Sequence, residues 1–132
     1  MLSNSPIVNR YVDRTPSSQA LAARALEQFP SAIPHDSRHT TPYGIYVETA
    51  KGPRKWDADG NDYVDYFGGH GALMLGHRNA EVEVCVQEAL AAGTHSGSSH
   101  QFEVAWAAAV QKLMPSAERI RFTASGTEAT LL

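Results

Sequence analysis

Three small residues near the end of the chain have the types and spacing of an anion site. Ser125, Gly126 and Thr127 follow a segment with apolar residues at alternate positions and precede a run of helix formers. We therefore expect a strand, a tight turn and a helix start between Arg119 and Leu132. The first N–H groups of a helix lack intrahelical partners and carry partial positive charge, and a glycine lets backbone approach a ligand. With two hydroxyl groups beside it, this turn suits a phosphate monoester.

The same triplet has a simpler interpretation. Taken alone, Ser-Gly-Thr before a helix is more often only an N-cap, in which a hydroxyl oxygen accepts a hydrogen bond from a free amide. The residues by themselves leave both hypotheses open.

Other reactive arrangements do not have the required spacing. His70 and His77, like His95 and His100, are not spaced as the helical ligands of a zinc protease are, and Cys85 is the single cysteine. The carboxylates from Asp57 to Asp62 suggest a calcium loop, but Gly60 comes too early and no glutamate closes such a loop. An Asp-Gly hairpin turn fits better. We predict no metal site, and no nucleophile with its base can be picked out.

Glycines crowd together between residues 68 and 76, interleaved with His70 and His77. Such a stretch permits tight chain crossings and exposes backbone to a ligand, or is simply a mobile connector. It is neither a dinucleotide-binding fingerprint nor a Walker loop, because the strand, helix and Gly-Lys-Ser/Thr signals are missing.

The elements that must position these residues follow from hydrophobic periodicity. Residues 1–15 are polar and irregular, so we expect a flexible arm. A helix with Thr15 as N-cap is expected from Pro16 until Pro30 stops it, and a linker comes after it. Alternating strands separated by turn residues then predict an antiparallel meander over residues 45–67.

Two amphipathic helices come next, ended by Gly93 and Pro115. Cys85 lies on the apolar face of the first and is interpreted as a buried small hydrophobe. The expected organisation is an arm, helix and linker (1–42), a meander with a glycine-rich connector (43–78), and the start of a large domain (79–132). Because a helical pattern continues to Leu132 without a stop signal, we expect the N-terminal part of a longer protein.

Composition and charge argue against nucleic acid and membrane as binding partners. The net charge is −3, 42% of residues are hydrophobic, and no apolar run reaches membrane-spanning length. We expect a cytoplasmic protein that binds neither nucleic acid nor membrane.

Several motifs, in the right order, resemble one enzyme family. The run from Arg121 to Thr130, Arg-Phe-Thr-Ala-Ser-Gly-Thr-Glu-Ala-Thr, resembles the phosphate cup of the class III pyridoxal-phosphate (PLP) aminotransferases. The branch that contains glutamate-1-semialdehyde aminomutase is the most similar. The segment from Ala50 to Tyr66 resembles the meander of that family, and Leu75-Gly76-His77 resembles the next segment of the family pattern. The resemblance runs from about Ser31 onwards.

The resemblance implies an incomplete α/β chain of fold type I, with a small antiparallel sheet before a large, mostly parallel domain. It also implies PLP as cofactor, a homodimer, and an amino or keto acid as substrate. Ser125, Gly126 and Thr127 would bind the cofactor phosphate. Arg38 aligns with an arginine that receives the substrate carboxylate, a task that suits its bidentate fork. Taken alone, Arg38 is more simply a solvated linker residue.

The chain departs from the family pattern at two histidines. His70 falls where the similar aminomutases carry a tryptophan beside the substrate, and its surroundings look more like a transaminase. His100 stands near the usual position of a threonine helix cap. The resemblance also places the Schiff-base lysine beyond residue 132, so we predict no catalytic residue in this chain. The lysines present are not substitutes: Lys51, Lys55 and Lys112.

We therefore expect part of a PLP-dependent aminotransferase. One alternative is glutamate-1-semialdehyde 2,1-aminomutase itself. A second is that the 132-residue chain is a non-catalytic fragment or dimerisation module.

Overall fold

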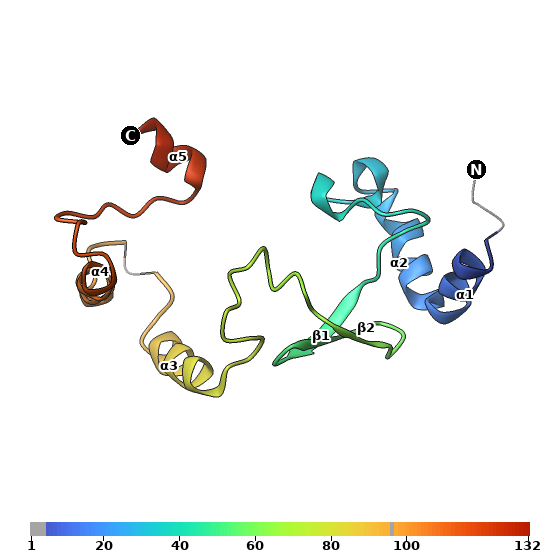
Figure 1. Cartoon of the computed structure of the whole chain (residues 1–132), viewed down its shortest axis with the longest axis horizontal. Helices are drawn as coiled ribbons and strands as arrows, with labels where there is room; N and C mark the ends of the chain where they lie inside the picture. Colours follow the sequence, from blue (N-terminus) through green and yellow to red (C-terminus); the bar gives the residue numbers. More distant parts are fainter. Residues whose placement is uncertain (1–4, 96) are drawn as a thin grey trace. The chain divides into compact units, whose positions relative to one another are not determined.

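This computed structural model describes residues 5–95 and 97–132. In these residues the chain forms helices and a small antiparallel sheet (Figure 1). The helices are α1 (Pro6–Arg14), α2 (Pro16–Ala25), α3 (Ala80–Ala91), α4 (Gln101–Leu113) and α5 (Gly126–Leu131), with the one-turn 3-10 helices η1 (Pro30–Ala32) and η2 (Asp36–Arg38). The strands are β1 (Val47–Lys51), β2 (Arg54–Asp57) and β3 (Asp62–Val64). Two compact units divide the chain, Met1–Gln87 and Glu88–Leu132. None of the described helices is long and apolar enough to cross a membrane.

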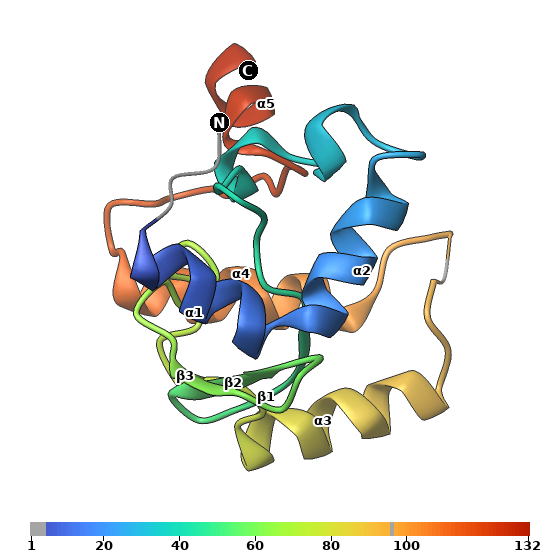
Figure 2. The same cartoon turned by 90° about the vertical axis from the view of Figure 1, so that its right-hand side faces the viewer.

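The first unit contains the predicted meander, with strand order β1-β2-β3 (Figure 2). Between the paired residues Lys51 and Arg54, the turn has Gly52 at φ 54° followed by proline. A positive φ strains residues that have a side chain, so this turn needs glycine at its first central position. The proline that follows keeps its fixed negative φ. The second turn places Gly60 at φ 79°. The antiparallel meander and its Asp-Gly turn are therefore confirmed.

Helix α1 occupies residues for which we expected an irregular arm, so that expectation is wrong for residues 6–14; residues 1–4 lie outside the described part. Its start carries a signal that the sequence analysis overlooked. Ser5 Oγ accepts from the amide of Ile7 at 3.3 Å, and Pro6 occupies the first turn. Tyr11 then donates its hydroxyl to the carbonyl of Tyr43 at 2.7 Å, which ties the helix to the chain that enters the meander.

Helix α2 begins after Thr15 as predicted, but the cap comes from elsewhere. The Thr15 hydroxyl donates to the carbonyl of Tyr11 at 2.7 Å. The carboxylate of Asp59, in the second meander turn, accepts from the amides of Ser17 and Ser18 at 2.7 and 3.1 Å. A negative charge at these free N–H groups also complements the helix dipole. The helix ends at Ala25, one turn earlier than the sequence predicts.

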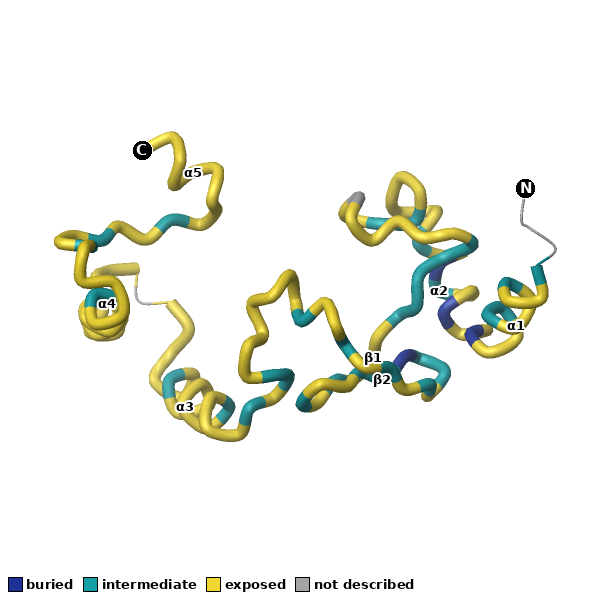
Figure 3. Tube along the Cα trace, viewed as in Figure 1, coloured by how far each residue is buried: buried dark blue, intermediate teal, exposed yellow. Residues whose placement is uncertain are grey.

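The buried centre of this unit is mostly polar (Figure 3). Its members among the described residues are Thr15, Ser18, Ala22 and Asp57. Asp57 is 2% exposed and accepts from Asn61 and from the hydroxyl of Tyr63, at 2.8 Å. Burial alone would raise the pKa of Asp57, but hydrogen bonds from Asn61 and Tyr63 outweigh it and lower that pKa. Burial and the bond to Asp57 raise the pKa of Tyr63 to about 12.

The second unit contains α4 and α5. His100 caps α4: its ring accepts from the amide of Phe102, while Glu103 accepts from the His100 amide. The end of the loop before α4 is therefore a capping turn. Trp106 of α4 stacks on Phe122, with ring centroids 3.8 Å apart and planes 7° from parallel.

Two expectations from sequence are wrong near these helices. Residues 120–122 form no strand, because strand pairing needs a neighbour and none of the described residues pairs with them. Cys85 of α3 is exposed, because no described helix or strand packs extensively on this helix.

Candidate functional site

The predicted phosphate cup lies at the start of α5, in the second unit. Ser125 is the N-cap, and its hydroxyl oxygen accepts from the amide of Glu128 at 3.2 Å. The Glu128 carboxylate in turn accepts from the amide of Ala124 at 3.0 Å. This arrangement is close to a capping box, and the Ser-x-x-Glu pattern that signals it was overlooked in the sequence.

Capping does not use all donors of this turn. Among the described hydrogen bonds, none uses the amides of Gly126 or Thr127 or the Thr127 hydroxyl. A Cβ built on Gly126 would meet nothing within 4 Å, so space is open beside the backbone. Two free amides, a free hydroxyl and the positive end of a helix fit the chemistry of a phosphate. The N-cap and phosphate-cup hypotheses are therefore compatible in one turn.

Arg38 ends η2 in the first unit and is exposed. Its guanidinium makes no hydrogen bond or ion pair with any side chain that the structure describes. It is therefore available for an anionic ligand, as the resemblance implies, although nothing in these contacts selects a carboxylate.

His70 lies in the glycine-rich stretch, also in the first unit. It is exposed and has φ 60°, a conformation that residues with a side chain rarely adopt. Its ring packs edge-on against Phe67, with centroids 4.3 Å apart. Arg38 and His70 share no contact among the described residues. The phosphate cup belongs to the other unit, Glu88–Leu132.

Sequence reasoning missed Asp65, a buried carboxylate with several partners. Its side chain is 5% exposed and lies 3.1 Å from the ammonium of Lys55 and 2.7 Å from Nε2 of His77. It also accepts from the amides of Phe67 and Gly68, at 3.1 and 3.2 Å. His77 and then Lys55 hold the pKa of Asp65 well below its ordinary range, so the carboxylate stays ionised.

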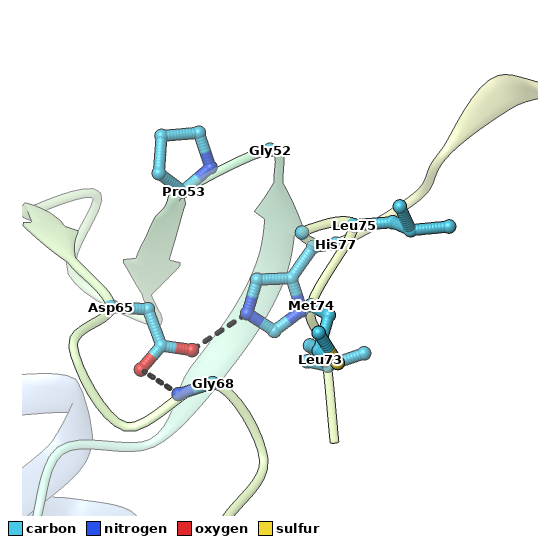
Figure 4. Close-up of a pocket in the computed structure, with 9 residues that line it drawn as sticks. Gly52, Pro53, Asp65, Gly68, Leu73, Met74, Leu75 and His77 are labelled. Atoms are coloured by element: carbon cyan, nitrogen blue, oxygen red, sulfur yellow. Dashed lines mark hydrogen bonds and ion pairs between the residues drawn. The ribbon is translucent and has the colours of Figure 1, made fainter. Parts of the chain in front are cut away.

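A pocket of about 340 Å³ opens beside this carboxylate (Figure 4). Figure 4 shows Asp65 between the backbone nitrogen of Gly68 and the ring of His77, with Leu73, Met74 and Leu75 across the pocket. No sequence spacing predicts the contacts of Asp65, because its side-chain partners come from different elements. Lys55 is in β2, and His77 is at the far end of the loop of residues 66–77.

Backbone hydrogen bonds also fix the end of the loop of residues 66–77, at His77. Gly52 and His77 exchange two hydrogen bonds, of 2.8 and 2.9 Å, in an isolated antiparallel bridge. A Cβ on Gly76 would lie 2.9 Å from the carbonyl oxygen of Gly52. Glycine is therefore required where these two segments cross.

The lysines of the chain have ordinary environments. Lys55 is engaged by Asp65, Lys51 is exposed at the end of β1, and Lys112 lies in the last turn of α4. Among the described residues, no group of three or more His, Cys, Asp or Glu side chains could hold a metal ion.

Comparison with known proteins decides the family. The family described as aminotransferase class-III matches residues 35–131. This chain belongs to the class III aminotransferases. One curated relative is the glutamate-1-semialdehyde 2,1-aminomutase of Methanothrix thermoacetophila, which is 41% identical over 115 residues. The matched residues are 87% of this chain and 27% of that protein. The chain thus spans about a quarter of the length of the curated relatives it matches.

Solved structures agree with this class III assignment. A β-phenylalanine aminotransferase from Variovorax paradoxus has a TM-score of 0.88 and 30% identity, covering 93% of this chain and 29% of its own. A transaminase solved with PLP bound has a TM-score of 0.84 and 34% identity, covering 89% of this chain and 28% of its own. The predicted family, its aminomutase-like branch and the incomplete α/β fold of PLP-dependent transferases are confirmed.

Proposed function

We propose that this chain is part of a PLP-dependent aminotransferase that moves an amino group between an amino acid and a keto acid. The observation that carries the proposal is the set of unused donors at the start of α5, in a chain of the class III family. The similar transaminase with bound PLP supports the choice of cofactor. When bound, PLP supplies an electron sink for bond changes at the amine-bearing carbon.

The residues of the chain have binding and orienting roles in this proposal. The amides of Gly126 and Thr127 and the hydroxyls of Ser125 and Thr127 hold the cofactor phosphate. Arg38 binds the substrate carboxylate through its two-pronged guanidinium. His70 lies beside the substrate.

We place the covalent attachment of the cofactor on a lysine outside these 132 residues. The Lys55 ammonium is occupied by Asp65, which supports this placement. On this basis the chain alone does not catalyse transamination. A homodimer and a cytoplasmic location stay predictions from sequence.

Cofactor affinity tests the phosphate cup. In the full-length protein, Thr127→Val removes one hydroxyl donor to a charged group, so we expect PLP to bind on the order of tenfold more weakly. Thr130→Val is the matched control, because the Thr130 hydroxyl is bonded to the Thr127 carbonyl at 2.9 Å. The measurement is titration of the apoprotein with PLP, followed by absorbance. Equal affinity in both variants, or a wild-type protein that binds no PLP, would sink the proposal.

A second candidate is the aminomutase reaction, which the identity to curated aminomutases favours. His70 favours transamination, since it stands where the resemblance places a tryptophan in the aminomutases. Incubation with glutamate-1-semialdehyde and no separate amino acceptor distinguishes the two. Turnover under that condition supports the aminomutase, and turnover only with an added keto acid supports the transaminase.

A further inference from the structure

The carboxylate of Asp65 holds both ends of one loop, residues 66–77. Near the start of the loop, the amides of Phe67 and Gly68 donate to its Oδ1. At the end of the loop, His77 Nε2 lies 2.7 Å from its Oδ2. Lys55 fixes the same carboxylate to β2. Because the side chain is 5% exposed, water competes little for these bonds.

Backbone bonds inside the loop carry this constraint to His70. The amide of Gly71 donates to the carbonyl of Phe67 at 3.1 Å, and the amide of Leu73 donates to the carbonyl of Gly68 at 3.0 Å. His70 lies within both of these turns and keeps a φ of 60°. Such a conformation persists only where surrounding contacts hold it in place. Here the contacts are the turns from Phe67 and Gly68, which the Asp65 carboxylate fixes at their start.

We propose that Asp65, together with His77, is a positioning residue that sets where His70 lies against the substrate. This inference rests on the proposed function, in which His70 borders the substrate. Asp65 and His77 act through the loop and not by contact with the reacting atoms.

A double-mutant cycle in the full-length protein, loaded with PLP, tests the inference. Asp65→Asn is expected to raise the KM for the amino donor about tenfold with a smaller change in kcat, because the interaction is indirect. In a His70→Ala background, the same change is expected to have almost no further effect. Asp57→Asn is the matched control: it changes another buried, multiply bonded carboxylate of the same meander and is expected to leave KM unchanged.

His77 supplies a second route to the same result. His77→Gln retains an N–H donor near the ring Nε2 and is expected to keep most of the wild-type KM. His77→Leu has no donor and is expected to reproduce the effect of Asp65→Asn. Equal effects of the two His77 variants would contradict a role for the bond to Asp65.

Hydrogen exchange gives a readout that needs no activity. Asp65→Asn is expected to speed exchange of the amides at residues 67–73, and Asp57→Asn is expected not to. Unchanged exchange in that loop overturns the inference, and so does an equal KM effect of Asp65→Asn with and without His70. A wild-type protein without transaminase activity would contradict the proposed function, and hydrogen exchange would then decide the positioning role.

Discussion

At Gly76 the chain crosses Gly52 so closely that no side chain fits between them. The built Cβ of Gly76 falls 2.9 Å from a carbonyl oxygen, and the residue has φ 75°. Both constraints act on a residue that immediately precedes His77. The geometry of one glycine therefore bears on the position of the Asp65–His77 pair.

Gly76→Ala is expected to weaken the Gly52–His77 bridge by about 2–5 kcal/mol, from left-handed strain and backbone overlap together. Gly60→Ala is the control, since Gly60 has φ 79° but an added Cβ meets nothing within 4 Å. The control is expected to cost only the strain, about 1–2 kcal/mol. Hydrogen exchange at the amides of Gly52 and His77, and at the Gly60 turn, measures both losses. Equal losses would show that the crossing tolerates a methyl group.

Arg38→Ala is expected to raise the KM for amino acids about 10–100-fold, because a charge-assisted bidentate contact is lost. An amine substrate without a carboxylate is expected to show little change. Arg38→Lys is expected to lie between, since an ammonium lacks the planar fork. Steady-state kinetics with matched substrates provides the measurement. An equal loss for both kinds of substrate would assign Arg38 to some other task.

Sequence alone predicts a site whose residues are neighbours in the chain, but not one whose residues meet only on folding. The Ser125–Thr127 turn was predicted because its chemistry is local: cap, glycine and helix start are neighbours in the chain. Asp65 was missed because its partners lie up to 12 residues away on different elements. Only the folded chain brings such donors to one carboxylate.

At the scale of elements, the second meander turn joins the N-terminal helices to the sheet. Asp59 caps α2, and Asn61 and Arg14 exchange hydrogen bonds of 2.8 and 2.9 Å. Beneath them, the Asp57 carboxylate organises the turn itself. A single hairpin thus positions two helices through polar contacts.

The charge of Asp57 should make this assembly sensitive to acid. The folded chain lowers the pKa of Asp57 below its ordinary 3.8, so the folded state holds fewer protons than the unfolded state. Its stabilising contribution is present above that value and is lost as pH falls below it, toward the folded pKa.

Asp57→Asn is expected to lower the free energy of unfolding near neutral pH by about 2 kcal/mol, since the donors around it lose a charged acceptor. The variant is also expected to lose less stability than the wild type as pH falls below about 4. Urea unfolding of the first unit, followed by Trp56 fluorescence in a Trp106→Phe background so that only this unit is observed, measures both effects. Asp62→Asn is the control, because Asp62 forms an exposed ion pair with Arg54. A parallel pH profile in the Asp57 variant would contradict the assignment.

Elements with clear turn or stop signals, the meander and α4, were predicted correctly from sequence, and the strand expected at residues 120–122 was not. Helix α4 combines a clear apolar stripe with a stop at Pro115, and it forms from Gln101 to Leu113. The segment at residues 120–122 alternates like a strand but has no described neighbour to pair with. Alternation indicates a tendency to extend, and hydrogen bonds to another strand make the sheet.

At the scale of the whole molecule, large apolar side chains remain exposed in both units. Met74 is 92% exposed in the first unit, and Val104 and Leu113 of α4 are 72% and 83% exposed in the second. Ala22 is the single apolar member of the buried set among the described residues. Exposed apolar surface of this kind marks regions that other protein surface usually covers.

The 132-residue chain on its own is therefore expected to bind a hydrophobic dye strongly and to unfold with low cooperativity. Substituting Val104 and Leu113 by Lys is expected to reduce dye binding while α4 keeps its helicity. Dye fluorescence and circular dichroism test this. A sharp thermal transition without dye binding would mean that these faces are already covered.

One thiol and two indoles give this molecule a ready set of optical reporters. Cys85 is the single cysteine, it is exposed, and α3 carries it close to the boundary between the units. Trp56 belongs to one unit and Trp106 to the other. A fluorophore attached to Cys85 could accept energy from either indole, so single-tryptophan variants would measure how far each unit lies from the labelled helix.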